Sequence, residues 1–181
     1  RLADAVHAQH AAGSAVAVEA GVDSIEHGMG MDPDLLPRMA EQGIALTPTL
    51  SVITTSLAEV RERPDGPQKD WYVAGASAHG NLVAAAAEAG VTVLAGTDSS
   101  RLHGRVVDEI RALAGAGVSP HQALAAASWT ARAYLGLAGL AQGAPADAVV
   151  YDEDPRIDLR QLDAPRAVIL RGRVINQRTS S

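Results

Sequence analysis

The chain of 181 residues contains no cysteine, which excludes both disulfide bonds and thiolate metal sites. Any metal bound by this sequence must therefore use imidazole and carboxylate groups. Basic residues are also few, because 15 Lys and Arg stand against 21 Asp and Glu, for a formal net charge of -6. Scattered basic residues in an acidic chain lack the electrostatic footprint of nucleic-acid binding. Nucleic acid is therefore not an expected partner.

The sequence also lacks an apolar run of the kind that crosses a membrane. The uncharged stretch between Arg111 and Arg132 contains Gly, Ser, Pro, His and Gln, which do not suit a membrane span. No basic and then apolar leader opens the chain at Arg1. Because hydrophobic residues make up 47% of the sequence, a globular core can form. We expect a cytoplasmic protein that has no membrane partner.

Apolar, β-prone segments alternate with helix-prone segments through the first hundred residues. Strands are predicted at residues 2–7, 22–26, 44–50 and 91–95, and helices at 11–20, 34–42 and 71–89. Glycine ends each of these helices, and Asp32-Pro33 is typical of a helix start. The polar stretch at 61–70 is predicted to be a surface loop. Successive strand and helix pairs indicate a parallel sheet.

Two further helices complete the first part of the chain, and the character of the sequence changes after Gly139. Helices are predicted at 106–114 and 120–135, and the second begins with Ser119 and Gln122, a pair that suits a capping box. Residues 147–151 and 167–176, the latter interrupted by Gly172, are typical of short antiparallel strands. We therefore expect two parts, a parallel α/β portion at 1–138 and a small β element at 139–181.

Side chains able to bind a metal follow three of the four predicted parallel strands. His7 ends the first strand, His27 follows the second in the run Ile25-Glu26-His27-Gly28, and Asp98 follows the fourth in Ala95-Gly96-Thr97-Asp98. The third strand ends near Thr49 and offers no strong ligand. All strands of a parallel barrel point the same way, and its active site lies at their carboxyl ends. His7, His27 and Asp98 are therefore expected at one metal site.

At these residues the sequence resembles the amidohydrolase superfamily, in particular its prolidase-like and imidazolonepropionase-like members. The matching pieces run from Val6-His7-Ala8 through AGVDSIEHG, the PTL run, AGVTVLAGTD, TARAYLGL and ADAVVYDEDP, and they cover nearly the whole chain. The resemblance implies an α/β fold that is the C-terminal half of a (β/α)8 TIM barrel. It comprises strands 5–8 with their helices and the C-terminal segment of a small β domain.

The resemblance also implies roles for the three candidate residues. His7 and His27 would be ligands of one divalent metal, with zinc as the first expectation because imidazole and carboxylate suit it. Asp98 would be both a metal ligand and the catalytic group, carrying a proton from the attacking water to the leaving nitrogen. Asp98 also suits the N-cap of a following turn.

Some ligands of that family have no counterpart in this sequence. Its members carry a His-x-His pair after the first strand and usually a carboxylated Lys or a Glu after the fourth. The single lysine, Lys69, lies in the predicted polar loop and is rejected as a bridging ligand. The three remaining donors suffice for one zinc ion with an open position, but not for a paired site.

These observations predict a metal-dependent hydrolase of amide, peptide or cyclic amide C–N bonds, acting on a small amide or dipeptide-like molecule and present here as its C-terminal portion. One alternative is a catalytically silent fragment or self-associating module, because a half barrel has open strand edges. Another is a deaminase with a single metal ion. Open edges favour a homo-oligomer or pairing with a missing N-terminal half.

The other histidines and the tryptophans are assigned minor roles. His10 lies one helical turn beyond His7 and is the alternative ligand if the register differs. His103 is a weak candidate for substrate contact, because it lies in the loop after Asp98. Four side chains are expected on helix surfaces or between helices: His79 and His121 at the surface, Trp71 and Trp129 in packing. The arginines near the C-terminus are expected on a solvated hairpin face.

Overall fold

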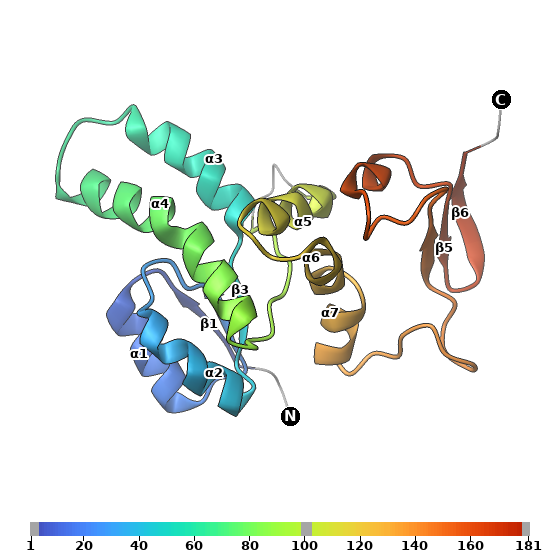
Figure 1. The fold of residues 1–181 in the computed structure, drawn as a ribbon, viewed down its shortest axis with the longest axis horizontal. Coiled ribbons are helices and arrows are strands. Elements are labelled where there is room, and N and C mark those ends of the chain that lie inside the picture. The colour runs from blue at the N-terminus through green and yellow to red at the C-terminus, as the bar shows by residue number, and fades with distance from the viewer. Residues whose placement is uncertain (1–3, 99–102, 179–181) are drawn as a thin grey trace.

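The computed structural model describes residues 4–98 and 103–178, in which a parallel and an antiparallel sheet are joined by helices (Figure 1). The parallel sheet has the order β1-β2-β3, with β1 at Ala5–Ala8, β2 at Ser24–His27 and β3 at Ala45–Thr47. Its strands therefore point the same way, as predicted.

The predicted fourth strand is reduced to one parallel bridge between Leu46 and Val93. The backbone N–H of Leu94 still donates to the carbonyl of Leu46 at 2.8 Å. The next N–H, that of Ala95, donates instead to the carbonyl of Ala126 at 3.0 Å. The segment predicted as a strand over 91–95 does run parallel to β3, but the pairing is shorter than predicted. The backbone turns at Ala95 toward the helix that contains Ala126.

Most of the predicted helices are present. The helices are α1 (Ala11–Ala20), η1 (Pro33–Leu35), α2 (Leu36–Gln42), α3 (Leu50–Arg61), α4 (Pro67–Glu88), α5 (Val106–Gly115), α6 (Pro120–Ala126) and α7 (Trp129–Tyr134). Gly21 and Gly43 end α1 and α2 in the left-handed conformation, with φ of 68° and 70°. The Asp32 carboxylate accepts the N–H of Asp34, as expected of an N-cap.

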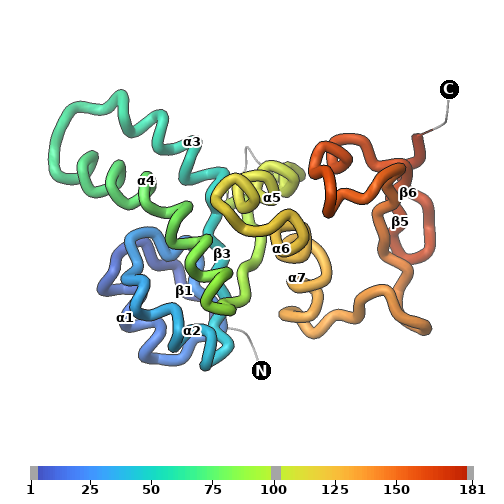
Figure 2. The backbone as a smooth tube through the Cα atoms, in the orientation of Figure 1, coloured from blue at the N-terminus to red at the C-terminus, as the bar shows by residue number. Residues whose placement is uncertain are grey.

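Helix α3 was not predicted. The strand expected over 44–50 ends at Thr47, because Pro48 has no N–H for the ladder and Thr49 is left-handed with φ of 49°. The helix begins at the next residue. It forms an antiparallel hairpin with α4 that extends from the rest of the chain (Figure 2). The loop predicted at 61–70 is correspondingly shorter, since only residues 62–66 separate the two helices.

The helix predicted at 120–135 is two helices, α6 and α7. The Ser119 hydroxyl accepts the N–H of Gln122 at 3.3 Å and lies 2.6 Å from its side-chain oxygen, so the predicted cap is present. The break falls at Ala127 and Ser128, where Ser128 leaves the helical region with φ of -136° and ψ of -104°. Neither residue is Gly or Pro, so no helix breaker in the sequence marks this interruption.

The antiparallel sheet confirms the predicted β element near the C-terminus. It has the order β4-β5-β6, with β4 at Ala148–Val150, β5 at Ala167–Leu170 and β6 at Arg173–Gln177. A 3-10 turn, η3 (Leu159–Asp163), connects this part to α5. Arg111 of α5 pairs with Asp163 at 2.6 Å, and Leu162 is only 5% exposed.

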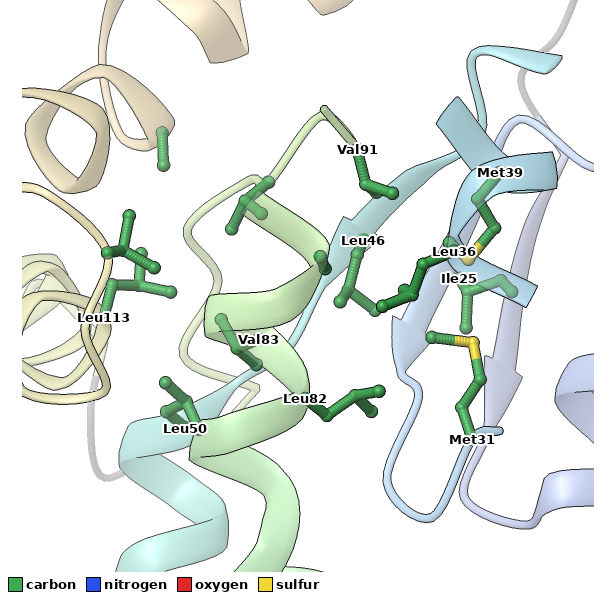
Figure 3. Close-up of a cluster of buried hydrophobic side chains, with 14 of the residues drawn as sticks. Ile25, Met31, Leu36, Met39, Leu46, Leu50, Leu82, Val83, Val91 and Leu113 are labelled. Carbon is green, nitrogen blue, oxygen red and sulfur yellow. The ribbon is translucent and has the colours of Figure 1, made fainter. Parts of the chain in front are cut away.

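The core lies between the parallel sheet and α4. Ile25 and Leu46 from the strands lie on the side of α4 that carries Leu82, and the cluster extends past Val83 to Leu113 of α5 (Figure 3). Burial of each such side chain contributes about 1.5–3 kcal/mol. This packing holds the carboxyl ends of β1, β2 and β3 in a fixed relation. Among the described residues, no helix is both long and apolar enough to cross a membrane.

Candidate metal centre

Three donor groups converge at the carboxyl end of the parallel sheet. His7 lies in β1, His27 is the last residue of β2, and Asp98 follows the segment that pairs with β3. One donor atom from each lies within 4.8 Å of the others. The Nε2 atom of His27 is 2.8 Å from Nε2 of His7 and 3.5 Å from Oδ2 of Asp98. Two imidazoles and a carboxylate around one point form a donor set that suits zinc.

Thr49 fixes the orientation of the His27 ring. Its Oγ1 lies 2.6 Å from Nδ1 of His27, within hydrogen-bond distance. With Nδ1 engaged by the hydroxyl, Nε2 faces His7 and Asp98. Histidines that bind metals commonly donate their second nitrogen to such a partner, which sets the tautomer and the ring plane.

The environment of His27 favours its neutral form. The side chain is 2% exposed, and burial is the largest cause that lowers its pKa. A positive charge on His7 also lowers this pKa, whereas Asp98 and Glu26 raise it. Because only the neutral imidazole has a free nitrogen lone pair, a lowered pKa keeps His27 available as a ligand.

The backbone at this rim is strained at three positions. His27, Thr49 and Asp98 have positive φ angles of 68°, 49° and 41°, and Arg171 is the only other described non-glycine residue to share this property. The left-handed conformation costs an L-residue about 1–2 kcal/mol, and it is least expected of a β-branched threonine. Such strain persists where the surroundings enforce it, and it clusters at functional sites.

Two glycines next to the donors let strands and loops approach closely. A Cβ atom on Gly28 would lie 2.9 Å from Cδ1 of Leu46, and Gly28 also has a φ of 66°. A Cβ atom on Gly96 would lie 2.6 Å from Cγ2 of Thr47. Carbon atoms in proteins do not approach each other this closely, so a larger residue at Gly28 or Gly96 would displace its neighbours.

A cavity of about 580 Å³ opens beside the three donors, and His27 and Asp98 line it. The α3–α4 hairpin supplies most of the wall, including Trp71 and Tyr72 of α4. Trp71 stacks on His10 with ring centroids 4.2 Å apart. The site therefore combines polar donors with an aromatic wall, as small-molecule sites commonly do.

The remaining residues singled out from the sequence are not among the three convergent donors, although Lys69 lines the same cavity. His10 stacks on Trp71 and is not in the group of convergent donors. His103 is exposed and does not line the described cavity. Lys69 donates to the carbonyl of Arg63 and to Asp65, both in or beside the loop between α3 and α4.

The prediction that His79 is a surface residue was wrong. The side chain is 1% exposed, because α4 turns this face toward the start of α3. Its Nε2 donates to the carbonyl of Pro48 at 2.9 Å, and burial lowers its pKa. His121 is exposed as predicted, with its ring 5.1 Å from that of Trp129. Trp129 is itself 41% exposed and so packs less completely than expected.

Two polar residues that support the site escaped the sequence reasoning. Thr49 was considered only as a possible metal ligand, and a weak one, although a hydroxyl at a strand end can also orient a neighbouring histidine. Glu109 lies among apolar residues of α5 and is 0% exposed. An acidic residue beside Ile110 and four residues before Leu113 was the available signal, because a buried carboxylate needs partners.

Comparisons with known proteins agree with this fold. The family model described as "Amidohydrolase family" matches residues 3–175. An uncharacterized protein of Mycobacterium tuberculosis is 44% identical over 163 residues, which are 86% of this chain and 43% of that protein. Ochratoxinase of Aspergillus niger is 33% identical over 170 residues, which are 90% of this chain and 35% of that protein.

Solved structures give the same result. The crystal structure of A. niger ochratoxinase matches with a TM-score of 0.83 at 29% identity, over 96% of this chain and 41% of that one. A Xaa-Pro dipeptidase with bound methionine matches with a TM-score of 0.83 at 27% identity, over 95% of this chain and 44% of that one. The chain thus spans less than half the length of these relatives. It belongs to the amidohydrolase family.

Proposed function

We propose that this chain forms the C-terminal part of a metal-dependent hydrolase that cleaves C–N bonds of small amides or dipeptide-like molecules. The observation that supports this most strongly is the convergence of His7, His27 and Asp98 within 4.8 Å. The proposal assigns residues 1–138 to strands 5–8 of a TIM barrel and 139–181 to a partial small β domain. Relatives named as a dipeptidase and as ochratoxinase support the choice of bond.

The donor set fits a divalent cation, with zinc as the first choice. His7, His27 and Asp98 would hold the ion, and three protein ligands are the number found in catalytic zinc sites that keep an open position. The contact between His27 and Thr49 supports this fit, because it engages Nδ1 and turns Nε2 toward the other donors. When bound, the cation would polarise the scissile carbonyl and lower the pKa of an attacking water.

Asp98 suits the proton transfers of such a reaction. Its side chain is 56% exposed and lines the cavity, whereas its Oδ2 lies 3.5 Å from His27. A carboxylate placed between solvent and the donor cluster would accept a proton from water and deliver it to the leaving nitrogen. The aromatic side chains of Trp71 and Tyr72 would contact the substrate on one side of the cavity.

The test measures hydrolysis of a panel of Xaa-Pro dipeptides and N-acyl amino acids. The chain is assayed alone and within the complete reading frame that encodes it, each with added zinc and with a chelator. We expect hydrolysis by the complete protein that requires the metal and is lost in Asp98→Asn. Hydrolysis that survives both chelation and this substitution would refute the proposal. So would a complete, metal-loaded protein that cleaves no member of the panel.

A further inference from the structure

The strained turn that carries Thr49 is held by a buried carboxylate from another helix. Glu109 of α5 is 0% exposed. Its Oε1 accepts the backbone N–H of Leu50 at 2.8 Å, and its Oε2 accepts that of Ser51 at 2.7 Å. These are the first two N–H groups of α3, which have no partner within their own helix. Both carboxylate oxygens of Glu109 are therefore used to cap this helix.

This arrangement changes what the N-cap residue of α3 is free to do. A threonine at an N-cap normally turns its hydroxyl toward the N–H groups of the first turn. Thr49 occupies the N-cap but makes no side-chain hydrogen bond to the helix. Its hydroxyl instead lies 2.6 Å from Nδ1 of His27. Glu109 supplies hydrogen-bond acceptors for the start of α3, which the Thr49 side chain does not provide.

A second buried side chain holds the same turn from the other side. His79 of α4 donates to the carbonyl of Pro48 at 2.9 Å, one residue before Thr49. The turn is thus held on both sides of Thr49, by α4 through a carbonyl and by α5 through two N–H groups. These contacts explain how a threonine is kept at a φ of 49° despite the steric cost.

We propose that Glu109 is a positioning residue for the candidate metal centre, which acts by capping α3 so that the Thr49 hydroxyl accepts a hydrogen bond from Nδ1–H of His27. The inference rests on the proposed function only in so far as His27 is a ligand. The linked contacts from Glu109 to the start of α3 and from Thr49 to His27 form a hydrogen-bond relay. This relay is present in the metal-free protein. It determines which ring nitrogen of His27 carries the proton.

The test reads the His27 tautomer directly. Long-range proton–nitrogen correlation spectra of the metal-free protein at pH 8 distinguish the two ring nitrogens. We expect the Nδ1–H tautomer to dominate in the wild type and in Thr49→Ser, which retains the hydroxyl. We expect its population to fall in Thr49→Val and in Glu109→Gln, since the amide NH₂ of glutamine cannot accept an N–H. The matched control is Asp108→Asn, which loses the same charge on α5 at a site paired with Arg105 on the exposed surface.

A second measurement separates this inference from the proposed function. Zinc affinity, measured by competition with a chromophoric chelator, should fall about 10-fold or more in Glu109→Gln and stay unchanged in Asp108→Asn. If Glu109→Gln does not fold, Glu109→Asp replaces it, because the shorter side chain keeps the charge but cannot reach both N–H groups. Loss of the Nδ1–H tautomer of His27 in either Glu109 variant supports the relay, whether or not the wild type binds zinc. Failure of the wild type to bind zinc would count against the proposed function alone. An unchanged tautomer in a folded Glu109 variant, or an Nε2–H tautomer in the wild type, would overturn the relay.

Discussion

At the scale of single residues, His7 and His10 provide the clearest contrast. Both are exposed imidazoles near the start of the chain, but only His7 lies at the donor cluster, with its Nε2 2.8 Å from that of His27. Under the proposed assignment His7→Ala removes a direct ligand, so zinc affinity should fall by more than the roughly 10- to 100-fold loss typical when only a ligand's hydrogen-bond partner is removed. His10→Ala is the control and should bind zinc as the wild type does. Chelator competition measures both, and a larger loss in His10→Ala would contradict the assignment.

His79 makes the stability of the metal-free protein depend on pH. Burial lowers its pKa below the ordinary value of 6.5, and the hydrogen bond to Pro48 opposes this shift only in part. As the pH falls through 6.5, the unfolded chain binds a proton at this position before the folded chain does. The unfolding free energy gained from a neutral His79 is therefore present above pH 6.5 and lost below it.

His79→Gln should flatten this dependence, because glutamine keeps an N–H donor for the Pro48 carbonyl and does not titrate. Urea denaturation with a chelator present, at intervals between about pH 5 and 8, gives the unfolding free energies. Below pH 6.5 the wild type should lose stability more steeply than the variant. His121→Gln, at an exposed position, should follow the wild-type curve. Parallel curves for the wild type and His79→Gln would contradict the expectation.

The sequence predicts the donors better than it predicts their supports. His7, His27 and Asp98 can be placed together because each follows a β-prone segment and parallel strands end at one edge. The positive φ of Thr49 and the capping of α3 by Glu109 depend on contacts between residues 58 or 59 positions apart. No local pattern reports such a contact, which is why the start of α3 was assigned to a strand.

At the scale of elements, the approach of residues 93–98 to β3 brings Asp98 to the cluster. Gly96 permits this approach, because a Cβ atom there would lie 2.6 Å from Cγ2 of Thr47. Gly96→Ala should push this segment away from β3, which lowers both the unfolding free energy and the zinc affinity. Overpacking of this kind typically costs about 1–3 kcal/mol. Urea denaturation and chelator competition measure the two effects.

Gly115→Ala is the matched control for this substitution. Gly115 ends α5, and a Cβ atom added there would lie more than 4 Å from other heavy atoms. Its φ is not positive, so alanine fits there without strain. The stability of this variant should equal or slightly exceed that of the wild type, since alanine favours helices. If Gly96→Ala were as well tolerated as Gly115→Ala, the close approach of this segment to β3 would be excluded.

At the scale of the whole molecule, η3 packs against α5 and so joins the part that contains the antiparallel sheet to the helices. Leu162 is 5% exposed and belongs to the main hydrophobic cluster, whereas every residue of β6 is exposed. Leu162→Ala should therefore loosen the part that contains β4, β5 and β6 and leave the parallel sheet intact. A buried leucine truncated to alanine typically costs about 2–5 kcal/mol.

Hydrogen exchange measured by mass spectrometry can follow the two sheets separately. In Leu162→Ala we expect faster exchange in peptides from residues 148–177 and wild-type protection in those from residues 24–47. Ile157→Ala, at a side chain that is 85% exposed, should change neither. Equal acceleration in both sheets would show instead that they unfold as one unit.

The two sheets differ in how well the sequence predicts the positions and lengths of their strands. The antiparallel strands were located correctly, because Gly172 and the alternation around it mark a hairpin. The length of the fourth parallel strand was not, because the N–H of Ala95 finds its acceptor on Ala126, beyond α5 and in α6. Such competition between a strand and a distant helix is a property of the folded molecule.

The central claim is that His7, His27 and Asp98 bind one divalent cation. Anomalous diffraction at the zinc edge, from crystals of the zinc-loaded chain, tests it most directly. We predict a single strong peak with imidazole nitrogens of His7 and His27 at about 2.0–2.1 Å and a carboxylate oxygen of Asp98 at about 2.0–2.2 Å. A peak bound by other residues, or no peak near His27, would contradict the account.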